Sequence, residues 1–441
     1  MIAEQLDDLW LGKMPSDWKR SRIRNVATLS PNYSQTRPSS DEPCTVVPME
    51  LLSDDGAIDA TNQQSLNDIS TGLSLFENGD VLFAKITPCM ENGKGAFVRQ
   101  LPTRYAFGST EFHVLRAGKK VDGQFLYYAT FNPVYRAYAA ENMVGAAGQK
   151  RVSSRFLKDT RLFLPPLPEQ QRIAAYLDAS CAAIDAAVAA KRRQLETLGA
   201  LRASIIIRSV TQGLNLRAVM KPSGLDWVPE VPVHWQVQQI KRLCSLVRGQ
   251  FTHRPRNDPA LYDGPYPFIQ TGDITAAGKY IRTHSQTLNE LGLSASKQFP
   301  RGTLVMSIAA NIGDVAILDF EACFPDSMIG MIPGHKTNLD FLYYLMRSMR
   351  SIMLRSAVQS TQLNLNYVRI GTNFAPVPPL KEQAAIAEYL DAKEHESHLI
   401  SSTIEAQIAT LTAYRKSLIH ECVTGQRRVT EADINRVKAH G

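Results

Sequence analysis

This chain contains nearly the same segment twice. Residues 165–178 read PPLPEQQRIAAYLD, and residues 378–391, 213 positions later, read PPLKEQAAIAEYLD. The same offset aligns LGALRASIIIRSVTQG at 198–213 with LTAYRKSLIHECVTGQ at 411–426. Self-similarity at a fixed period indicates that one structural unit occurs repeatedly in the chain. The 441 residues are therefore predicted to form two equivalent halves, each long enough for its own core.

Each half begins with a related segment that carries two tryptophans. The first reads WLGKMPSDWKRSRI at 10–23, and the second reads WVPEVPVHWQVQQI at 227–240. Both have Trp, Pro, Trp and Ile at the same spacing. We interpret the second tryptophan of each segment, Trp18 and Trp235, as a core residue.

A region of mixed pattern follows each of these segments. Short apolar runs such as GDVLFAKI (79–86) and GTLVMSIA (302–309) lie between Gly, Pro and Asn, which predicts short buried strands. The phrase FLYY recurs at 125–128 and 341–344, in stretches that predict helices. Each half is therefore predicted to contain one globular domain with both strands and helices.

A long Ala-rich stretch follows each Pro-Pro-Leu segment. Paired prolines cannot continue a helix, and Glu169 and Glu382 suit the positive end of a helix that starts there. Apolar residues then recur every seven positions on two rows, with Lys191 and Ser397 as polar interruptions, and Gly following each stretch. Such rows are typical of a coiled-coil seam. The predicted seam residues are Ile173, Leu177, Ile184, Leu198, Leu201, Ile205, Ile386, Leu390, Ile400, Ile404, Leu411 and Leu418.

Either stretch alone also fits an amphipathic helix packed on its own domain. Two such helices of equal length in one chain, each trailing a globular domain, favour pairing with each other. The sequence therefore predicts an α+β fold with a pseudo-twofold internal repeat, in which two globular α/β domains in tandem are separated by two long helices forming an antiparallel coiled coil.

Composition limits the environment and the partners. The formal net charge is +7 and the sequence pI is about 9.0, which is compatible with a polyanionic partner. The six cysteines are scattered without a C-x-x-C pair, so neither a disulfide framework nor a zinc knuckle is expected. No signal peptide and no stretch of 18 uncharged apolar residues is evident. We expect a cytoplasmic protein without a membrane partner.

The sequence offers no convincing active site. FNPVY (131–135) has one proline where adenine methyltransferases have two, and no Gly-rich nucleotide loop precedes it. We interpret Pro133 as a helix break. ENGKGAF (91–97) lacks the phosphate-loop frame and is read as a turn, with Lys94 as a candidate phosphate contact. No metal-ligand pattern is present among the histidines, so neither a catalytic nor a metal site is predicted.

Polar and basic loops are more informative. SPNYSQTRPSS (30–40) and VRGQFTHRPRN (247–257) occupy matching places in the two halves, and both are rich in Arg, Gln, Thr, Asn and an aromatic residue. Arg and Gln side chains read guanine and adenine edges in the major groove, whereas Ser, Thr and Lys serve phosphate contacts. The alternative is a solvated loop, and the equivalent placement of the two loops favours DNA binding.

Two further candidate surfaces are less specific. GQKRVSSR (148–155) lies opposite STQLNLN (360–366), and either is also compatible with a structural turn. YPFIQTGDI (266–274) predicts a strand that ends in Gln270 and Thr271. Together the candidate DNA-binding residues are Asn32, Tyr33, Gln35, Arg37, Lys94, Gln149, Lys150, Arg151, Arg155, Arg248, Gln250, Thr252, His253, Arg254, Arg256, Gln270, Thr271, Thr361, Gln362 and Asn364.

The whole layout resembles the specificity subunit of Type I restriction–modification systems. The two PPL-x-EQ-x-x-I-A-x-YLD segments carry the resemblance most specifically, and STQLNLN before PVPPLKEQ is similar to the family's usual exit from a recognition domain. The first copy departs from this pattern, with AGQKRVS at 147–153. The resemblance implies two target-recognition domains that each read one half of a split DNA sequence, and two conserved helices that set the spacer.

The resemblance also implies a division of labour. Two methyltransferase subunits would dock along the helices and restriction/translocase subunits through them, with S-adenosylmethionine, ATP and magnesium bound by those partners and no cofactor bound by this chain. The alternatives are a DNA methyltransferase with a built-in recognition domain and a non-catalytic coiled-coil scaffold. The expected parts are an N-terminal segment near the helices (1–14), recognition domain 1 (15–164), a central helix (165–215), recognition domain 2 (216–377), a C-terminal helix (378–426) and a tail (427–441).

Overall fold

The computed structural model describes residues 10–34, 37–146, 148–253, 255–309, 311–357 and 367–440. The chain forms two compact units. Unit 1 comprises Met1–Arg192 and Glu405–Gly441, and unit 2 comprises Arg193–Ile404. Each unit contains one globular domain and a part of each of two long helices, α5 (Leu167–Gln212) and α11 (Leu380–Thr424).

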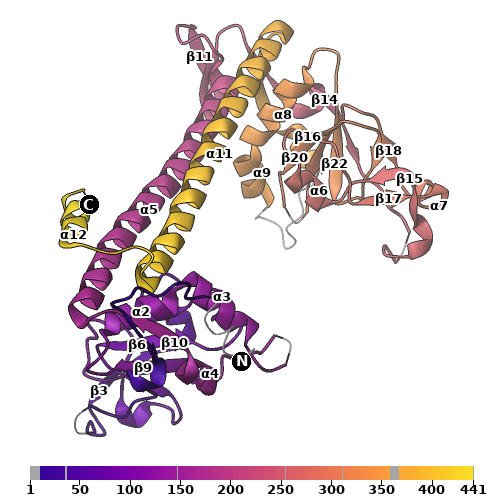
Figure 1. The fold of residues 1–441 in the computed structure, drawn as a ribbon. Helices are drawn as coiled ribbons and strands as arrows, with labels where there is room; N and C mark the ends of the chain where they lie inside the picture. The colour runs from indigo at the N-terminus through magenta and orange to yellow at the C-terminus, as the bar shows by residue number, and fades with distance from the viewer. Residues whose placement is uncertain are drawn as a thin grey trace. The chain divides into compact units, whose positions relative to one another are not determined.

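The globular domain of unit 1 is built on two four-stranded sheets (Figure 1). Its elements are β1 (Lys19–Arg22), β2 (Ala27–Leu29), β3 (Pro43–Val47), β4 (Gln63–Ser65), β5 (Ser74–Phe76), β6 (Asp80–Ala84), β7 (Gly95–Phe97), β8 (Ala106–Gly108), β9 (Phe112–Ala117), α2 (Gly123–Phe131), α3 (Pro133–Glu141), α4 (Ser154–Asp159) and β10 (Arg161–Leu164). One sheet has the order β2-β9-β6-β7 and is antiparallel, and the other has the order β4-β3-β8-β5. Helix α2 packs against β6, β7 and β9.

The globular domain of unit 2 repeats this plan. Its elements are β11 (Met220–Leu225), β12 (Val228–Pro232), β13 (Gln236–Gln239), β14 (Cys244–Arg248), β15 (Tyr262–Phe268), α6 (Thr271–Ala276), β16 (Tyr280–Ile281), β17 (Gln286–Leu288), α7 (Glu290–Ser294), β18 (Gln298–Phe299), β19 (Leu304–Ser307), β20 (Val315–Leu318), β21 (Ala322–Cys323), β22 (Met328–Pro333), α8 (Leu339–Ser348), α9 (Arg350–Ala357), α10 (Tyr367–Thr372) and β23 (Phe374–Val377). The order β14-β22-β19-β20 matches β2-β9-β6-β7, and β16 adds an edge strand. Helix α8 packs on β19 and β20.

The strands predicted from apolar runs are confirmed at the centre of each sheet. Strand β6 is buried at every position, and so are β19 and β20. Strands that are covered on both faces carry continuous apolar runs instead of alternating patterns. This is why the runs at 79–86 and 302–309 are visible in the sequence.

A two-stranded sheet closes each globular domain at its base. The strand after Trp18, β1, pairs antiparallel with β10, and the strand after Trp235, β13, pairs in the same way with β23. The segment that leads into each domain therefore lies beside the segment that leaves it. Both tryptophans are buried, which confirms their interpretation as core residues.

The FNPVY segment is a break between two helices. Asn132 caps α3 by accepting a hydrogen bond from the Val134 N–H at 3.0 Å, and Pro133 occupies the first position of that helix. Proline suits this position because its missing N–H would have no partner there. The interpretation of this motif as structural is confirmed.

The repeated PPL-x-EQ motif fastens each globular domain to the start of a long helix. In unit 1 the Gln170 carbonyl oxygen accepts from the Asp122 N–H at 2.8 Å, and its amide donates to the Lys120 and Pro165 carbonyls at 3.2 and 2.9 Å. Both Asp122 and its counterpart in unit 2 cap the N-terminus of the FLYY helix, α2 or α8. The side chain of this glutamine is thus a clamp between the two helices.

The same three hydrogen bonds recur in unit 2. The Gln383 carbonyl oxygen accepts from the Asn338 N–H at 2.8 Å, and its amide donates to the Lys336 and Pro378 carbonyls at 3.1 and 2.9 Å. Both clamp glutamines are only 1% exposed. The first function of the motif is therefore to join a domain to its helix.

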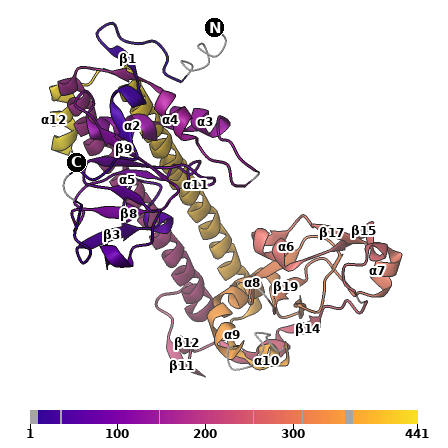
Figure 2. The same ribbon diagram turned by 90° about the horizontal axis from the view of Figure 1, so that it is seen from below.

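Within each unit the segments of α5 and α11 lie side by side and antiparallel (Figure 1, Figure 2). In unit 1, Arg415 of α11 pairs with Asp185 of α5 at 3.2 Å, and Arg428, just beyond α11, pairs with Glu169 near the start of α5 at 2.9 Å. In unit 2 the Arg202 Nε donates to Glu394 at 2.6 Å. The predicted antiparallel pairing is confirmed in both units.

Most predicted seam residues are buried or partly buried, and several of them share core clusters with the globular domains. The buried members are Ile173, Leu177, Ile184, Ile386, Leu390, Ile404 and Leu418, and Leu198, Ile205 and Leu411 are partly buried. Two members depart from the prediction: Leu201 is 53% exposed and Ile400 is 43% exposed. A strict seven-residue row assumes 3.5 residues per turn, whereas an ideal α-helix has 3.6. Residues seven positions apart therefore drift around the helix, and some of them leave the contact face.

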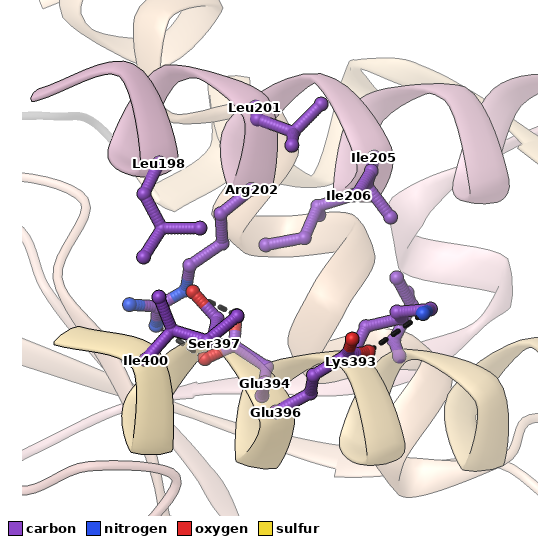
Figure 3. Close-up of a pocket in the computed structure, with 11 residues that line it drawn as sticks. Leu198, Leu201, Arg202, Ile205, Ile206, Lys393, Glu394, Glu396, Ser397 and Ile400 are labelled. Atoms are coloured by element: carbon purple, nitrogen blue, oxygen red, sulfur yellow. Dashed lines mark hydrogen bonds and ion pairs between the residues drawn. The ribbon is translucent and has the colours of Figure 1, made fainter. Parts of the chain in front are cut away.

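A half-open apolar groove marks this weak part of the seam in unit 2. Figure 3 shows Leu198 and Ile206 of α5 pointing toward α11, where Ser397 and Ile400 lie, while Leu201 projects away. The groove has a volume of about 130 Å³. Position 397 corresponds in the repeat to a buried isoleucine of the first copy, so the small serine leaves space.

Helix α5 contains an 18-residue window that is long and apolar enough, by composition alone, to cross a membrane. In unit 1, however, its residues Ile173, Leu177 and Ile184 belong to the same core cluster as Leu418 of α11. These three side chains of α5 therefore take part in packing within the protein.

Candidate nucleic-acid interface

The first candidate loop of unit 1 lies beside the end of β9. The Asn32 carbonyl accepts from the Arg116 guanidinium at 2.9 Å, and Arg116 is fixed to Asp80 by two contacts of 2.7 Å. Tyr33 packs edge-on against Tyr105, with 5.0 Å between ring centroids. The tyrosine is thus a packing residue, while the side chain of Asn32 is exposed.

The remaining candidates near this loop have different surroundings. Arg37 is exposed, and Gln35 lies outside the described residues. The Lys94 ammonium is partly buried and donates to the Met49 carbonyl at 2.9 Å, so at least one of its N–H groups is engaged within the domain. The sequence had left both a turn residue and a phosphate contact open for Lys94.

The second candidate surface of unit 1 lies at the other end of β9. The Arg151 guanidinium contacts the Glu111 carboxylate at 2.8 and 3.0 Å, and these hydrogen bonds hold the pKa of Glu111 below its ordinary value. The Nε2 atom of His113 lies 2.8 Å from the Val152 carbonyl. Backbone and side-chain contacts therefore fix this segment against the sheet.

Three polar side chains project from the segment. Gln149 and Lys150 are exposed. Arg155 is also exposed, with its Nε 3.9 Å from an Asp159 oxygen, and ion pairs with this exposure are weak. These three side chains are available to a partner at little electrostatic cost.

The structure does not bring the two candidate surfaces of unit 1 together. Glu111 precedes β9 and Arg116 lies near its end, and five residues of extended strand span about 17 Å. The two surfaces therefore flank one sheet at opposite ends.

In unit 2 one acidic residue holds both ends of the candidate loop. The Arg248 Nε donates to the Asp326 carbonyl at 2.8 Å, and the Arg256 guanidinium pairs with the Asp326 carboxylate. Gly249 follows directly, and a Cβ there would lie 2.2 Å from the Pro325 carbonyl oxygen. The path of the loop away from β14 thus requires glycine.

Two other candidate residues of this loop have polar partners within the domain. The Thr252 hydroxyl donates to a backbone carbonyl at 3.2 Å, and His253 Nε2 lies 3.1 Å from an Asp258 carboxylate oxygen. Gln250 is exposed, and Arg254 lies outside the described residues. The loop presents polar groups while its backbone is anchored on both sides.

The predicted strand end at Gln270 and Thr271 is wrong. Strand β15 ends at Phe268, because Gln270 and Asp273 form a capping box that starts α6 at Thr271. The Gln270 amide also donates to the Gln286 side chain at 2.9 Å. The other candidates of unit 2, Thr361, Gln362 and Asn364, lie outside the described residues.

Sequence reasoning missed a polar cleft in unit 2. The cleft has a volume of about 1120 Å³ and is lined by Arg282, Asn311 and Arg350 of the globular domain and by His395 and His398 of α11. These residues come from segments far apart in the sequence, so no local motif marks them. Only the fold assembles this surface.

Metal binding and catalysis by a cysteine thiol have little support in the described part of the chain. No group of three or more His, Cys, Asp or Glu side chains there is placed to hold a metal ion. All six cysteines are free, and burial raises the pKa of the Cys422 thiol to about 12 and of Cys181 to about 11. Thiols with such pKa values are poor nucleophiles.

Two duplicated domains, each fastened to its own long helix, define a class of two-domain protein with an internal repeat. The model of the Type I restriction modification DNA specificity domain matches residues 15–197 and again residues 232–410. This chain belongs to that family.

Individual relatives agree with this assignment. The EcoAI specificity subunit of Escherichia coli is 30% identical over 165 residues, which are 36% of this chain and 27% of that protein. The MjaX type I restriction enzyme specificity subunit of Methanocaldococcus jannaschii is 24% identical over 404 residues, 87% of this chain and 88% of that protein. The match to the Escherichia coli relative thus spans about a quarter of its length.

Solved structures agree on the fold. A chain from a structure of a type I R-M system, solved to explain complex assembly and conformational transition, aligns with a TM-score of 0.75 at 18% identity, covering 93% of this chain and 98% of that one. The HsdS subunit from Thermoanaerobacter tengcongensis aligns with a TM-score of 0.56 at 18% identity, covering 94% and 98%.

Proposed function

We propose that this chain is the DNA-specificity subunit of a Type I restriction–modification complex and is not catalytic alone. One observation carries the proposal. The same scaffold occurs twice, with the same glutamine clamp, yet the exposed loops on the two copies differ in sequence. A protein that reads two different half-sites needs two domains with the same scaffold and with different side chains on the loops that contact DNA.

The parts then have separate tasks. Recognition domain 1 (15–164) reads one half-site and recognition domain 2 (216–377) reads the other. The helical regions 165–215 and 378–426 set the unread spacer and dock methyltransferase subunits. The N-terminal segment (1–14), of which residues 1–9 lie outside the described residues, and the tail (427–441) are the remaining parts.

The complex supplies the chemistry. Double-stranded DNA and two methyltransferase subunits are the partners for modification, and restriction/translocase subunits join them for cleavage. S-adenosylmethionine, ATP and magnesium are bound by these partners, in the cytoplasm. This chain directs adenine methylation to one bipartite sequence.

The alternatives explain less. A methyltransferase with a built-in recognition domain requires a nucleotide-binding loop and a catalytic motif, and FNPVY is a helix break here. A plain coiled-coil scaffold gives no reason for two polar loops that differ between otherwise equal domains.

The test is to map methylated adenines in genomic DNA from cells with and without the intact chain. The expected result is one split motif that disappears with the chain. Methylation that is unchanged in its absence, or a continuous motif, contradicts the proposal.

A domain exchange tests the division of labour. Replacing residues 15–164 by the corresponding domain of a relative should change one half of the motif only. A change in both halves contradicts independent reading by the two domains.

A further inference from the structure

A second contact, beyond the glutamine clamp, joins each domain to its helix. In unit 1 the Tyr128 hydroxyl of α2 donates to Asp178 of α5 at 2.7 Å. In unit 2 the Tyr344 hydroxyl of α8 donates to Asp391 of α11 at 2.6 Å. The tyrosines belong to the FLYY segments and the aspartates end the YLD motifs, so both members of the pair are duplicated.

A cation completes the contact in both copies, but from different elements. In unit 1 the Arg99 guanidinium, just after β7, lies 2.9 Å from Asp178. In unit 2 the Lys279 ammonium, just before β16, lies 2.6 Å from Asp391. Two positions that are not equivalent in the repeat thus supply a positive charge to equivalent carboxylates, each from a residue close to a strand of the same domain.

The two contacts lie at a fixed distance along the helix. Eight residues separate the clamp glutamine from the aspartate in both copies, and eight residues rise about 12 Å in an α-helix. Apolar packing already joins each domain to its helix, because Leu177 or Leu390 lies in the same core cluster as residues of that domain. Two points 12 Å apart, a distance of about two helical turns, fix the direction of α2 or α8 against the long helix.

We propose that the Tyr–Asp–cation contact sets the angle between each recognition domain and its long helix, and thereby helps to set the spacer that the two half-sites tolerate. Asp178 and Asp391 act as positioning residues for bipartite recognition, and Asp391 does so from the wall of the polar cleft of unit 2, which Tyr344 and Lys279 also line. The contact involves no residue of the candidate reading loops. This inference rests on the proposed function and adds a determinant of spacing to it.

The test uses the assembled complex with its partner subunits and two variants of the second copy. Asp391→Asn removes one of the two carboxylates that hold Lys279, the other being Asp340 at 2.7 Å, and Tyr344→Phe removes one hydroxyl from a buried ring. The matched control is Glu396→Gln, an equal carboxylate-to-amide change on the same helix at a more exposed side chain.

Methylation rates are measured on duplexes that carry the mapped motif with its own spacer or with one base pair more or fewer. We expect the preference for the correct spacer to fall about tenfold in Asp391→Asn, equivalent to about 1.4 kcal/mol, and less in Tyr344→Phe. The base preference at each half-site should be unchanged in both. Asp178→Asn in the first copy should have the same effect, and Glu396→Gln should have none.

Several results overturn the inference. Folded variants with unchanged spacer preference show that the contact does not position the domain. Altered base preference at the second half-site shows that it serves reading instead. Folding of the variants is monitored by thermal unfolding. If both variants fail to fold, the contact serves stability alone. If the unaltered complex has no bipartite motif, the proposed function itself fails; a bipartite motif with unaffected spacing contradicts only this inference.

Discussion

Replacing Gln383 by methionine tests the glutamine clamp. Methionine has a similar length and shape but lacks the amide. The substitution leaves the Asn338 N–H and the Lys336 and Pro378 carbonyls without the three hydrogen bonds of 2.8 to 3.1 Å that the glutamine makes. The side chain is 1% exposed, so water does not readily replace it.

The cost follows from these lost partners. A buried donor or acceptor without a partner costs about 1–3 kcal/mol, and carbonyls with a second acceptor site lose less than an N–H does. The three groups together give about 3 kcal/mol of lost unfolding free energy. For a domain of this size each kcal/mol lowers the melting temperature by about 2–4 °C, so unit 2 should melt about 6–12 °C earlier.

Differential scanning calorimetry of the purified chain measures this shift. The mirrored change Gln170→Met should affect unit 1 by a similar amount, because the same three contacts recur there. Gln407→Met on an exposed face of α11 is the control and should leave the melting temperature within about 1 °C. A shift in Gln383→Met no larger than in this control would refute the argument from buried partners.

Three further predictions concern the seam, the loop and pH. Ser397→Ile should stabilise unit 2 by about 1–2 kcal/mol in chemical denaturation, because its repeat partner Ile184 is buried and the groove beside it is open; destabilisation would mean that the groove cannot accept the side chain. Arg256→Ala, which also frees Asp326, should weaken DNA binding by about 1–3 kcal/mol, and titrations at two salt concentrations separate base from phosphate contact; unchanged affinity at both removes this arginine from the interface. Burial lowers the pKa of His113 below 6.5, so the unfolded chain binds a proton more readily and folding stability should decline as pH falls through 6.5; the decline should be shallower in His113→Gln, and an equal slope in both proteins counts against this assignment.

The duplication made much of the architecture predictable. Repeated segments predicted two equivalent domains and two long antiparallel helices. The equivalent positions of Trp18 and Trp235 in the two halves likewise predicted that both side chains are buried. These features depend on local periodicity and on residues that recur at one offset, which a single sequence displays. Pro133 was likewise interpretable, since proline limits the backbone in every context.

The candidate interface was less predictable because its partners come from other strands. Nothing near Arg256 in the sequence indicates Asp326, and nothing near Arg151 indicates Glu111. Lys94 looked like a surface cation, yet a carbonyl 45 positions away holds it. Tertiary hydrogen bonds decide which polar loop residues face solvent, and local sequence carries no record of them.

These tertiary partners reveal one more regularity between the domains. Glu111 precedes β9 and Asp326 precedes β22, strands that occupy the same place in the repeated sheet, and each carboxylate holds an arginine of a candidate loop. An arginine side chain loses up to about 2 kcal/mol of rotamer entropy when it is immobilised. An arginine already held by a carboxylate has lost part of that entropy before DNA arrives, and its remaining N–H groups point in fixed directions. The same carboxylate reduces its attraction to phosphate, so these arginines are better suited to reading base edges than to holding the backbone.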